Sequence, residues 1–88
     1  MIQTIQKGDL VAYSEYLGML EVGIFAGKSH TSLHFWPLKQ SSVDRMDEGK
    51  KPYVKYIAGG HQDRRVVKVT TDVLEPEELE IYKKLKGE

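Results

Sequence analysis

Apolar and aromatic residues are most concentrated in one stretch of the chain, residues 20–38. Within it, β-branched and aromatic residues dominate two runs, residues 20–26 and 32–38, and a polar segment around Gly27 separates them. Each run is shorter than a typical helix and alternates in the manner of a half-buried strand. The pattern predicts two antiparallel strands joined by a turn, with the rest of the fold built around this hairpin.

Three further segments have strand character: residues 10–13, 53–58 and 65–71. A Gly-Asp turn leads into the first of them, and glycines between the other two favour a second hairpin. The polar residues 39–52 predict a long loop with one helical turn over residues 42–48. The expected fold is mainly β, a small SH3-like antiparallel barrel of about five strands over residues 7–71, followed by a C-terminal α-helix.

Alternation within residues 20–26 predicts which side chains form the core. The residues expected to face inward are Val22, Ile24 and Ala26. Phe25 falls on the opposite face, and Gly23 suits a place where a strongly bent strand or a neighbouring backbone needs space, as at the corner of a small barrel. In the last strand, Val67 is expected to join the core.

Residues 76–86 carry the signals of that helix. Pro76 suits the first helical position, acidic residues follow in the first turn, and lysines fill the last turn before Gly87. The apolar residues of one helical stripe are Leu79, Tyr82 and Leu85. We expect this stripe to pack over an open end or edge of the barrel.

Length and composition restrict the class of protein. The chain has 88 residues and no cysteine, which fits a single small domain and excludes disulfides, thiolate metal ligands and cysteine nucleophiles. The first residues lack the basic and apolar regions of a signal peptide, and no apolar run reaches the length of a membrane span. We therefore expect a soluble cytoplasmic protein with no cofactor.

Formal net charge is zero, but the charges are unevenly distributed. Residues 39–68 carry eight lysines and arginines against four acidic residues, whereas residues 69–88 carry three against six. Zero net charge argues against a dedicated nucleic-acid-binding protein. The basic middle still predicts a surface that attracts an anionic partner over a short range.

Catalytic and metal-binding chemistry finds little support in the sequence. His30 and His34 are four residues apart in a turn and a strand, which does not bring their imidazoles together, and no third ligand has suitable spacing. Ser29 or Ser32 could be combined with a histidine and Asp63 into a catalytic triad, but no nucleophile-elbow motif surrounds either serine. We expect no metal site and no enzymatic activity.

Two groups of residues are candidates for contact with a partner. Aromatic and basic side chains on outward strand faces suit a protein or stacked bases. This partner-binding set comprises His34, Trp36, Tyr53, Lys55, Arg64, Arg65 and Lys68. A glycine-rich turn with paired arginines suits phosphate, because backbone N–H groups and guanidinium groups both bind anions. This phosphate-binding set comprises Gly59, Gly60, His61, Arg64, Arg65, Lys50 and Lys51.

Both sets also have a purely structural interpretation. The glycine-rich segment fits an ordinary hairpin turn with solvated flanks. Several of the rings fit a role in the core, because so small a domain has few large apolar side chains to bury.

Two segments carry a family resemblance, LVAYSEYLGMLEVGIFAGKSHTSLHFWPL and RRVVKVTTDVLEPEELEIYKKLKG. A Gly-Asp-led first strand, a glycine in the second strand and a Val-rich last strand running into a Pro-Glu-Glu helix resemble the small SH3-like proteins encoded by tailed bacteriophages. The resemblance spans most of the chain except residues 39–52. It implies a small accessory protein that acts by binding, often to a host factor, and it transfers no target and no site residue.

Two functions of different classes fit these observations. The first is a non-catalytic protein-interaction module that docks on a larger cytoplasmic protein, of host or phage, and modulates it. The alternative is nucleic-acid or nucleotide binding through the basic hairpin and the exposed aromatic residues. An exposed edge strand would also allow homodimerisation by strand addition, and no membrane partner is expected.

Overall fold

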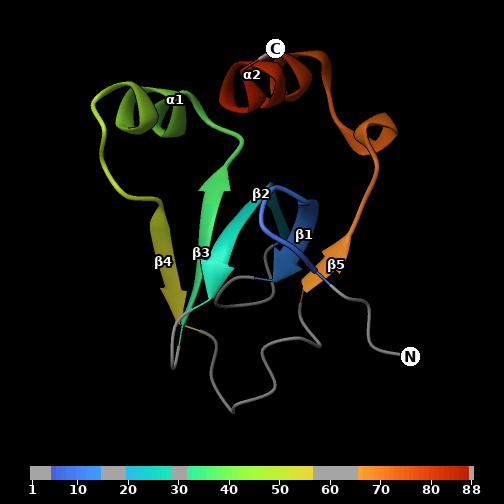
Figure 1. Cartoon of the computed structure of the whole chain (residues 1–88). Coiled ribbons are helices and arrows are strands. Elements are labelled where there is room, and N and C mark those ends of the chain that lie inside the picture. The colour runs from blue at the N-terminus through green and yellow to red at the C-terminus, as the bar shows by residue number, and fades with distance from the viewer. Residues whose placement is uncertain (1–4, 15–19, 29–31, 57–65, 88) are drawn as a thin grey trace.

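The computed structural model describes residues 5–14, 20–28, 32–56 and 66–87, and over these residues the chain is mainly β (Figure 1). The strands are β1 (Leu10–Ser14), β2 (Leu20–Lys28), β3 (Ser32–Pro37), β4 (Tyr53–Tyr56) and β5 (Val66–Lys68). The helices are α1 (Gln40–Asp47), a short 3-10 helix (Thr71–Val73) and α2 (Pro76–Lys86). The strand positions confirm the predicted β segments. β5 ends at Lys68, before the predicted end at residue 71, and the last two residues predicted for β4, 57–58, lie outside the described residues.

The strands form one antiparallel sheet in the order β4-β3-β2-β1-β5. The β2–β3 hairpin is confirmed, with Phe25 opposite Phe35. The predicted hairpin between β4 and β5 is wrong, because these two strands lie at opposite edges of the sheet (Figure 1). β5 pairs instead with β1, and this pairing brings Val66 into the same apolar cluster as Val11. Within the described residues the sheet is open.

Residues 39–52, predicted as a long loop with one helical turn over residues 42–48, contain the eight-residue helix α1, which is longer than that turn and begins two residues earlier. Its apolar residues Val43 and Met46 are three positions apart, so both face the same side of the helix. Val43 is buried, and Met46 packs against the same cluster of apolar side chains. Burial of this short stripe stabilises a helix that has no side-chain cap at its N-terminal end.

Both faces of the sheet are apolar, and each carries its own cluster of buried side chains. The aromatic cluster consists of Val11, Tyr13, Phe25, Leu33, Phe35 and Val66. The helix-side cluster consists of Leu10, Ile24, Leu38, Val43 and Leu85. Adjacent strand residues such as Ile24 and Phe25 point to opposite faces, so β2 contributes to both clusters.

These clusters confirm part of the predicted core and correct it at Phe25 and Val67. Ile24 is buried as predicted, Val22 is half-buried and packs against the same helix-side cluster, and Ala26 is half-buried. Phe25 is also buried, because its ring meets the Phe35 ring edge-on at a centroid distance of 5.8 Å. Val67 is 48% exposed, because β5 is an edge strand of the sheet. Val66 packs in the aromatic cluster, and Val67, the next residue, faces solvent.

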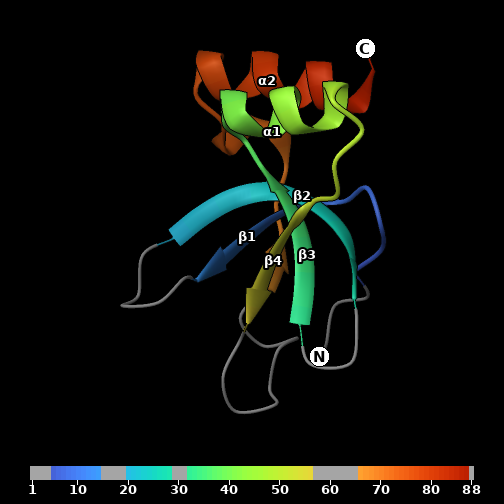
Figure 2. The ribbon, with the colours of Figure 1, turned by 90° about the vertical axis from the view of Figure 1, so that its left-hand side faces the viewer.

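The C-terminal helix α2 begins and ends as the sequence predicts. Pro76 opens it after a capping box in which the Glu75 N–H donates to the Glu78 carboxylate at 3.0 Å. Gly87, with a φ of 78°, ends it in the left-handed conformation. The helices α1 and α2 lie side by side across one end of the sheet (Figure 2), and Leu85 is the buried residue of α2. Neither helix, in the part of the chain described, is long and apolar enough to cross a membrane.

Gly23 lies where β2 and β3 approach most closely. A Cβ at this position would lie 2.8 Å from the carbonyl oxygen of Trp36 and 3.1 Å from the Cα of Pro37. Both atoms belong to paired backbone, which cannot move aside as a flexible side chain could. The prediction that a glycine is needed here for a neighbouring backbone is confirmed.

Gly23→Ala is therefore expected to lower the free energy of unfolding by about 1–3 kcal/mol, because the added methyl group overpacks the β2–β3 contact. Urea denaturation followed by circular dichroism measures the change. Leu20→Ala, at a residue of the same strand that is 79% exposed, is the control and should have little effect. Equal stability of the two variants would contradict the close approach.

Truncation to alanine should also distinguish two residues that the sequence predicts to be in the core, Ile24 and Val67. Ile24→Ala is expected to cost about 2–4 kcal/mol, because it opens a cavity in the helix-side cluster. Val67→Ala should cost less than about 1 kcal/mol, because the side chain is half-exposed at a sheet edge. The same denaturation measurement applies, and a larger loss for Val67→Ala would disprove the register of β5.

Candidate binding pocket

The structure separates the residues that the sequence proposed as one partner-binding surface. His34 and Trp36 lie on β3 and share a face of that strand. Tyr53 begins β4 at one edge of the sheet, whereas Lys68 ends β5 at the other edge. These residues therefore do not form one continuous surface.

Part of both candidate sets lies outside the described residues. These are Gly59, Gly60, His61, Arg64 and Arg65, together with the side chain of Lys55. The phosphate-binding interpretation of the glycine-rich turn therefore stays a prediction. Of its members, Lys50 and Lys51 are described.

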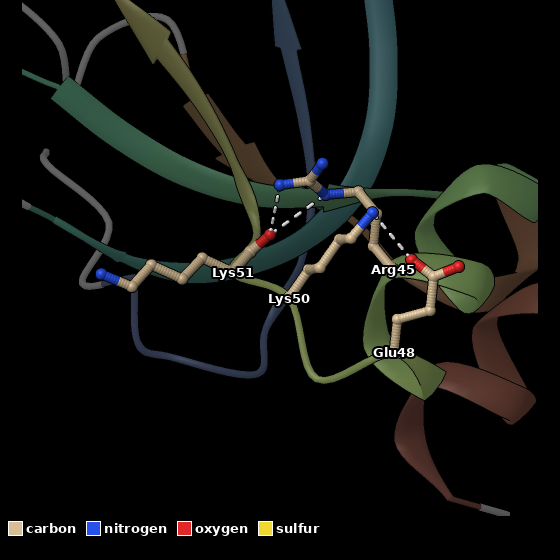
Figure 3. Close-up of polar contacts among 4 residues, drawn as sticks. All are labelled: Arg45, Glu48, Lys50 and Lys51. Atoms are coloured by element: carbon tan, nitrogen blue, oxygen red, sulfur yellow. Dashed lines mark hydrogen bonds and ion pairs between the residues drawn. The ribbon is translucent and has the colours of Figure 1, made fainter.

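Lys50 and Lys51 belong to the connection between α1 and β4, where Arg45 organises the backbone (Figure 3). The Arg45 guanidinium donates two hydrogen bonds to the carbonyl oxygen of Lys51, from Nε at 3.1 Å and from Nη2 at 2.7 Å. It also lies 4.4 Å from the centre of the Tyr53 ring, which favours a cation–π contact. Arg45 therefore fixes the path from helix to strand, a role that sequence spacing did not indicate.

Two described lysines of these sets, Lys50 and Lys68, have local acidic partners. Lys50 pairs with Glu48 at 2.8 Å (Figure 3), and both side chains are more than half exposed. Lys68 pairs with Asp9 at 3.5 Å, across the β1–β5 edge. The Asp9 carboxylate also accepts a hydrogen bond from the Gln6 N–H at 2.8 Å and so holds the predicted turn before β1. Much of this positive charge is thus balanced within the fold.

Trp36 is half-buried and packs against the helix-side cluster, so it is not the fully outward ring that strand alternation suggested. The reason is that α1 and α2 cover this face of the sheet near Trp36. The ring still reaches solvent through an apolar pocket of about 270 Å³. The apolar residues that line the pocket are Ile24, Phe25, Ala26, Trp36, Met46 and Leu85.

Two lysines and a glycine complete the lining of the apolar pocket: Lys7, Gly8 and Lys86. The Lys86 ammonium donates a hydrogen bond to the carbonyl oxygen of Gly8 at 3.0 Å, which ties the end of α2 to the turn before β1. Gly8 adopts a φ of 98°, a conformation that most other residues avoid. This contact holds one rim of the pocket in place.

A second hollow of about 430 Å³ lies on the other side of that contact and shares Gly8 and Lys86 with the apolar pocket. Its lining is polar and includes the Lys68–Asp9 pair and the hydroxyl groups of Thr71 and Tyr82. The two hollows differ in chemistry, because one is lined by rings and aliphatic chains and the other by charged and hydroxyl groups.

Sequence reasoning found only Trp36 among the side chains that matter for the apolar pocket. Met46, Leu85 and the two lysines come from elements far apart in the chain, and only the packing of the helices on the sheet brings them together. No local motif marks such a site. In the described part of the chain, no group of three or more metal-binding side chains is present.

Arg45→Ala is expected to lower the free energy of unfolding by roughly 1–2 kcal/mol, because it removes two hydrogen bonds to a carbonyl and the contact with the Tyr53 ring. Arg45→Lys should recover less than half of this loss, since an ammonium group cannot reproduce the planar two-donor geometry. Thermal and urea denaturation measure both changes. Lys50→Ala, which removes only an exposed ion pair, should change stability by less than about 0.5 kcal/mol, and a comparable loss there would show that Arg45 has no special role.

No family model, no curated protein and no solved structure matches this chain. The resemblance to small SH3-like phage proteins accordingly remains a prediction from the sequence pattern.

Proposed function

We propose that this protein is a non-catalytic binding module with an SH3-like barrel architecture, which docks on a larger cytoplasmic protein by accepting one of its apolar side chains. The observation that carries the proposal is the apolar pocket, where Trp36 and Met46 lie half-buried between the helices and the sheet. Aromatic and methionine side chains at a surface hollow are typical of protein-binding hot spots.

The size of the pocket supports a side chain as its occupant. Its volume of about 270 Å³ is slightly below the range of about 300–1,000 Å³ that is usual for sites of small molecules and cofactors. A single aromatic or long aliphatic side chain fits such a space. Its walls are also formed by four packed elements, so much of the site exists before a partner binds, which lowers the entropic cost of association.

The alternative of nucleic-acid binding has weaker support from the described residues. Arg45 and Lys50 are engaged with Lys51 and Glu48, and Lys68 lies at the far edge of the sheet with Asp9. Phosphate contacts require several cations along one track. Arg45, Lys50 and Lys68 do not provide such a track, and the protein-binding proposal is therefore the stronger one.

The resemblance to phage accessory proteins gives this proposal its biological setting. A small accessory protein of a tailed phage would use the pocket to hold a host or phage protein and modulate it. In that setting the partner is a bacterial cytoplasmic protein rather than a small substrate.

Filling the pocket should therefore abolish capture of a specific bacterial protein. Ala26 is half-buried in the pocket wall, so Ala26→Leu places additional atoms in the cavity without removing a core contact. Affinity isolation from nuclease-treated bacterial lysate, followed by mass spectrometry, would compare this variant with the wild type. We expect a protein that the wild type retains to be lost at least about tenfold from Ala26→Leu, as for other hot-spot contacts.

The control is Leu20→Ala, which changes an exposed residue of the same strand outside the pocket and should retain the partner. Melting temperatures verify that both variants are folded. Retention of the same protein by Ala26→Leu would contradict the pocket as the docking site. Recovery that depends entirely on nucleic acid would favour the alternative function.

A further inference from the structure

We infer that the partner of the apolar pocket presents an anionic segment, in which an apolar side chain is flanked by carboxylate groups. This inference rests on the proposed function and adds to it the chemical class of the ligand. Its basis is the combination of an apolar cavity with a rim that is exclusively cationic among the described residues, Lys7 and Lys86.

The charges around the pocket are of one sign. No acidic side chain belongs to the lining of the pocket within the described part of the chain. Lys7 is exposed, and among the described residues it has no ion-pair partner, in contrast to Lys50 and Lys68. A ligand that fills the cavity therefore meets a cation that the fold itself has not balanced.

Lys86 is held at the rim in a position to bind an anion. Its ammonium group uses one N–H to bond the Gly8 carbonyl at 3.0 Å, and two further donors remain on the same nitrogen. Fixing the side chain in advance reduces the entropy lost when a carboxylate binds.

One feature of the fold acts against an anion here, the C-terminal end of α2. Its last carbonyl groups carry partial negative charge. The Gly87 N–H lies within the closing turn and donates to the carbonyl of Lys84, and three lysines stand in the last turn. The full positive charge of Lys86 at the rim outweighs the partial charge of the helix end, so the rim remains attractive to a carboxylate.

The polar hollow beyond Lys86 offers a path for the chain that flanks the apolar side chain. It shares Gly8 and Lys86 with the apolar pocket, and its lining includes Thr70, Thr71 and Tyr82. The Thr70 hydroxyl donates to the Asp72 carboxylate. The other lysine of the hollow, Lys68, is paired with Asp9. The preference for an anion therefore belongs to Lys7 and Lys86, and the hollow supplies hydrogen-bonding groups.

The test uses a matched pair of small probes, hydrocinnamate and its neutral amide hydrocinnamide. Both carry a phenyl ring that fits the apolar pocket, and only the first carries a carboxylate. Trp36 is the single tryptophan of the chain and lines the pocket, so its fluorescence reports binding of either probe directly. We expect hydrocinnamate to bind at least about threefold more tightly, the gain that one or two exposed ion pairs provide.

Substitution of the rim lysines locates the preference. In the double variant Lys7→Gln with Lys86→Gln, the two probes should bind equally, at the affinity that the amide has for the wild type. Lys84→Gln removes an exposed lysine of the same helix that does not line the pocket, and it should keep the wild-type preference. Melting temperatures confirm that each variant is folded.

The possible results separate this inference from the proposed function. Equal binding of both probes to the wild type, or a preference that survives in the double variant, would overturn the anionic ligand and leave the apolar pocket as a binding site. Failure of both probes to change Trp36 fluorescence would remove the pocket and the inference with it. Concentration-dependent self-association in sedimentation velocity, lost in the double variant, would also overturn the inference by assigning the pocket to a second copy of this chain.

Discussion

Burial on both sides of β2 is the constraint on which the rest of this fold depends. Ile24 and Phe25 are consecutive, so they point to opposite faces of the sheet, and both are buried. Phe25 has its partners within the sheet, because the strands on either side contribute Tyr13 and Phe35 to the aromatic cluster. Ile24 has cross-strand neighbours in Leu10 of β1 and Trp36 of β3, but burial of this face of the sheet also requires a second layer. The helices supply it, and Leu85 from α2 and residues of α1 complete the helix-side cluster.

The requirement for a second layer also explains where the pocket lies. Two short helices cover one end of the sheet face (Figure 2), and they do not enclose all the apolar surface around Ile24 and Trp36. The uncovered remainder is framed by the turn before β1 and by the end of α2, which Lys86 and Gly8 hold together. A small domain that needs two cores but has few residues to cover them leaves such an opening as a direct consequence of its size.

The sequence predicted those features that depend on local chemistry. The bounds of α2 follow from Pro76, the acidic first turn and Gly87, and the requirement at Gly23 follows from a glycine within an apolar strand. It failed where distant contacts decide the structure. The pattern predicts one helical turn over residues 42–48, but α1 lacks a side-chain cap, and packing of Val43 in the helix-side cluster extends it to about two turns, from Gln40 to Asp47. The partner of β5 was equally undetermined, because three residues pair with any open edge that accepts their register.

The predicted basic surface and the charges that the fold leaves available to a partner lie in different parts of the chain. The number of lysines and arginines predicts a basic surface in the middle of the chain. Most of its described cations, however, are engaged within the fold: Arg45 donates to the Lys51 carbonyl, and Lys50 pairs with Glu48. Lys7 and Lys86 come from segments that the count did not single out. What distinguishes them is that folding places them beside an apolar cavity that has no acidic lining among the described residues. An ion pair that is already formed within the fold gives little to a partner, because breaking it costs what the new contact gains. The few cations that the fold leaves unbalanced beside an apolar surface therefore matter more for recognition than the larger number that it has already paired.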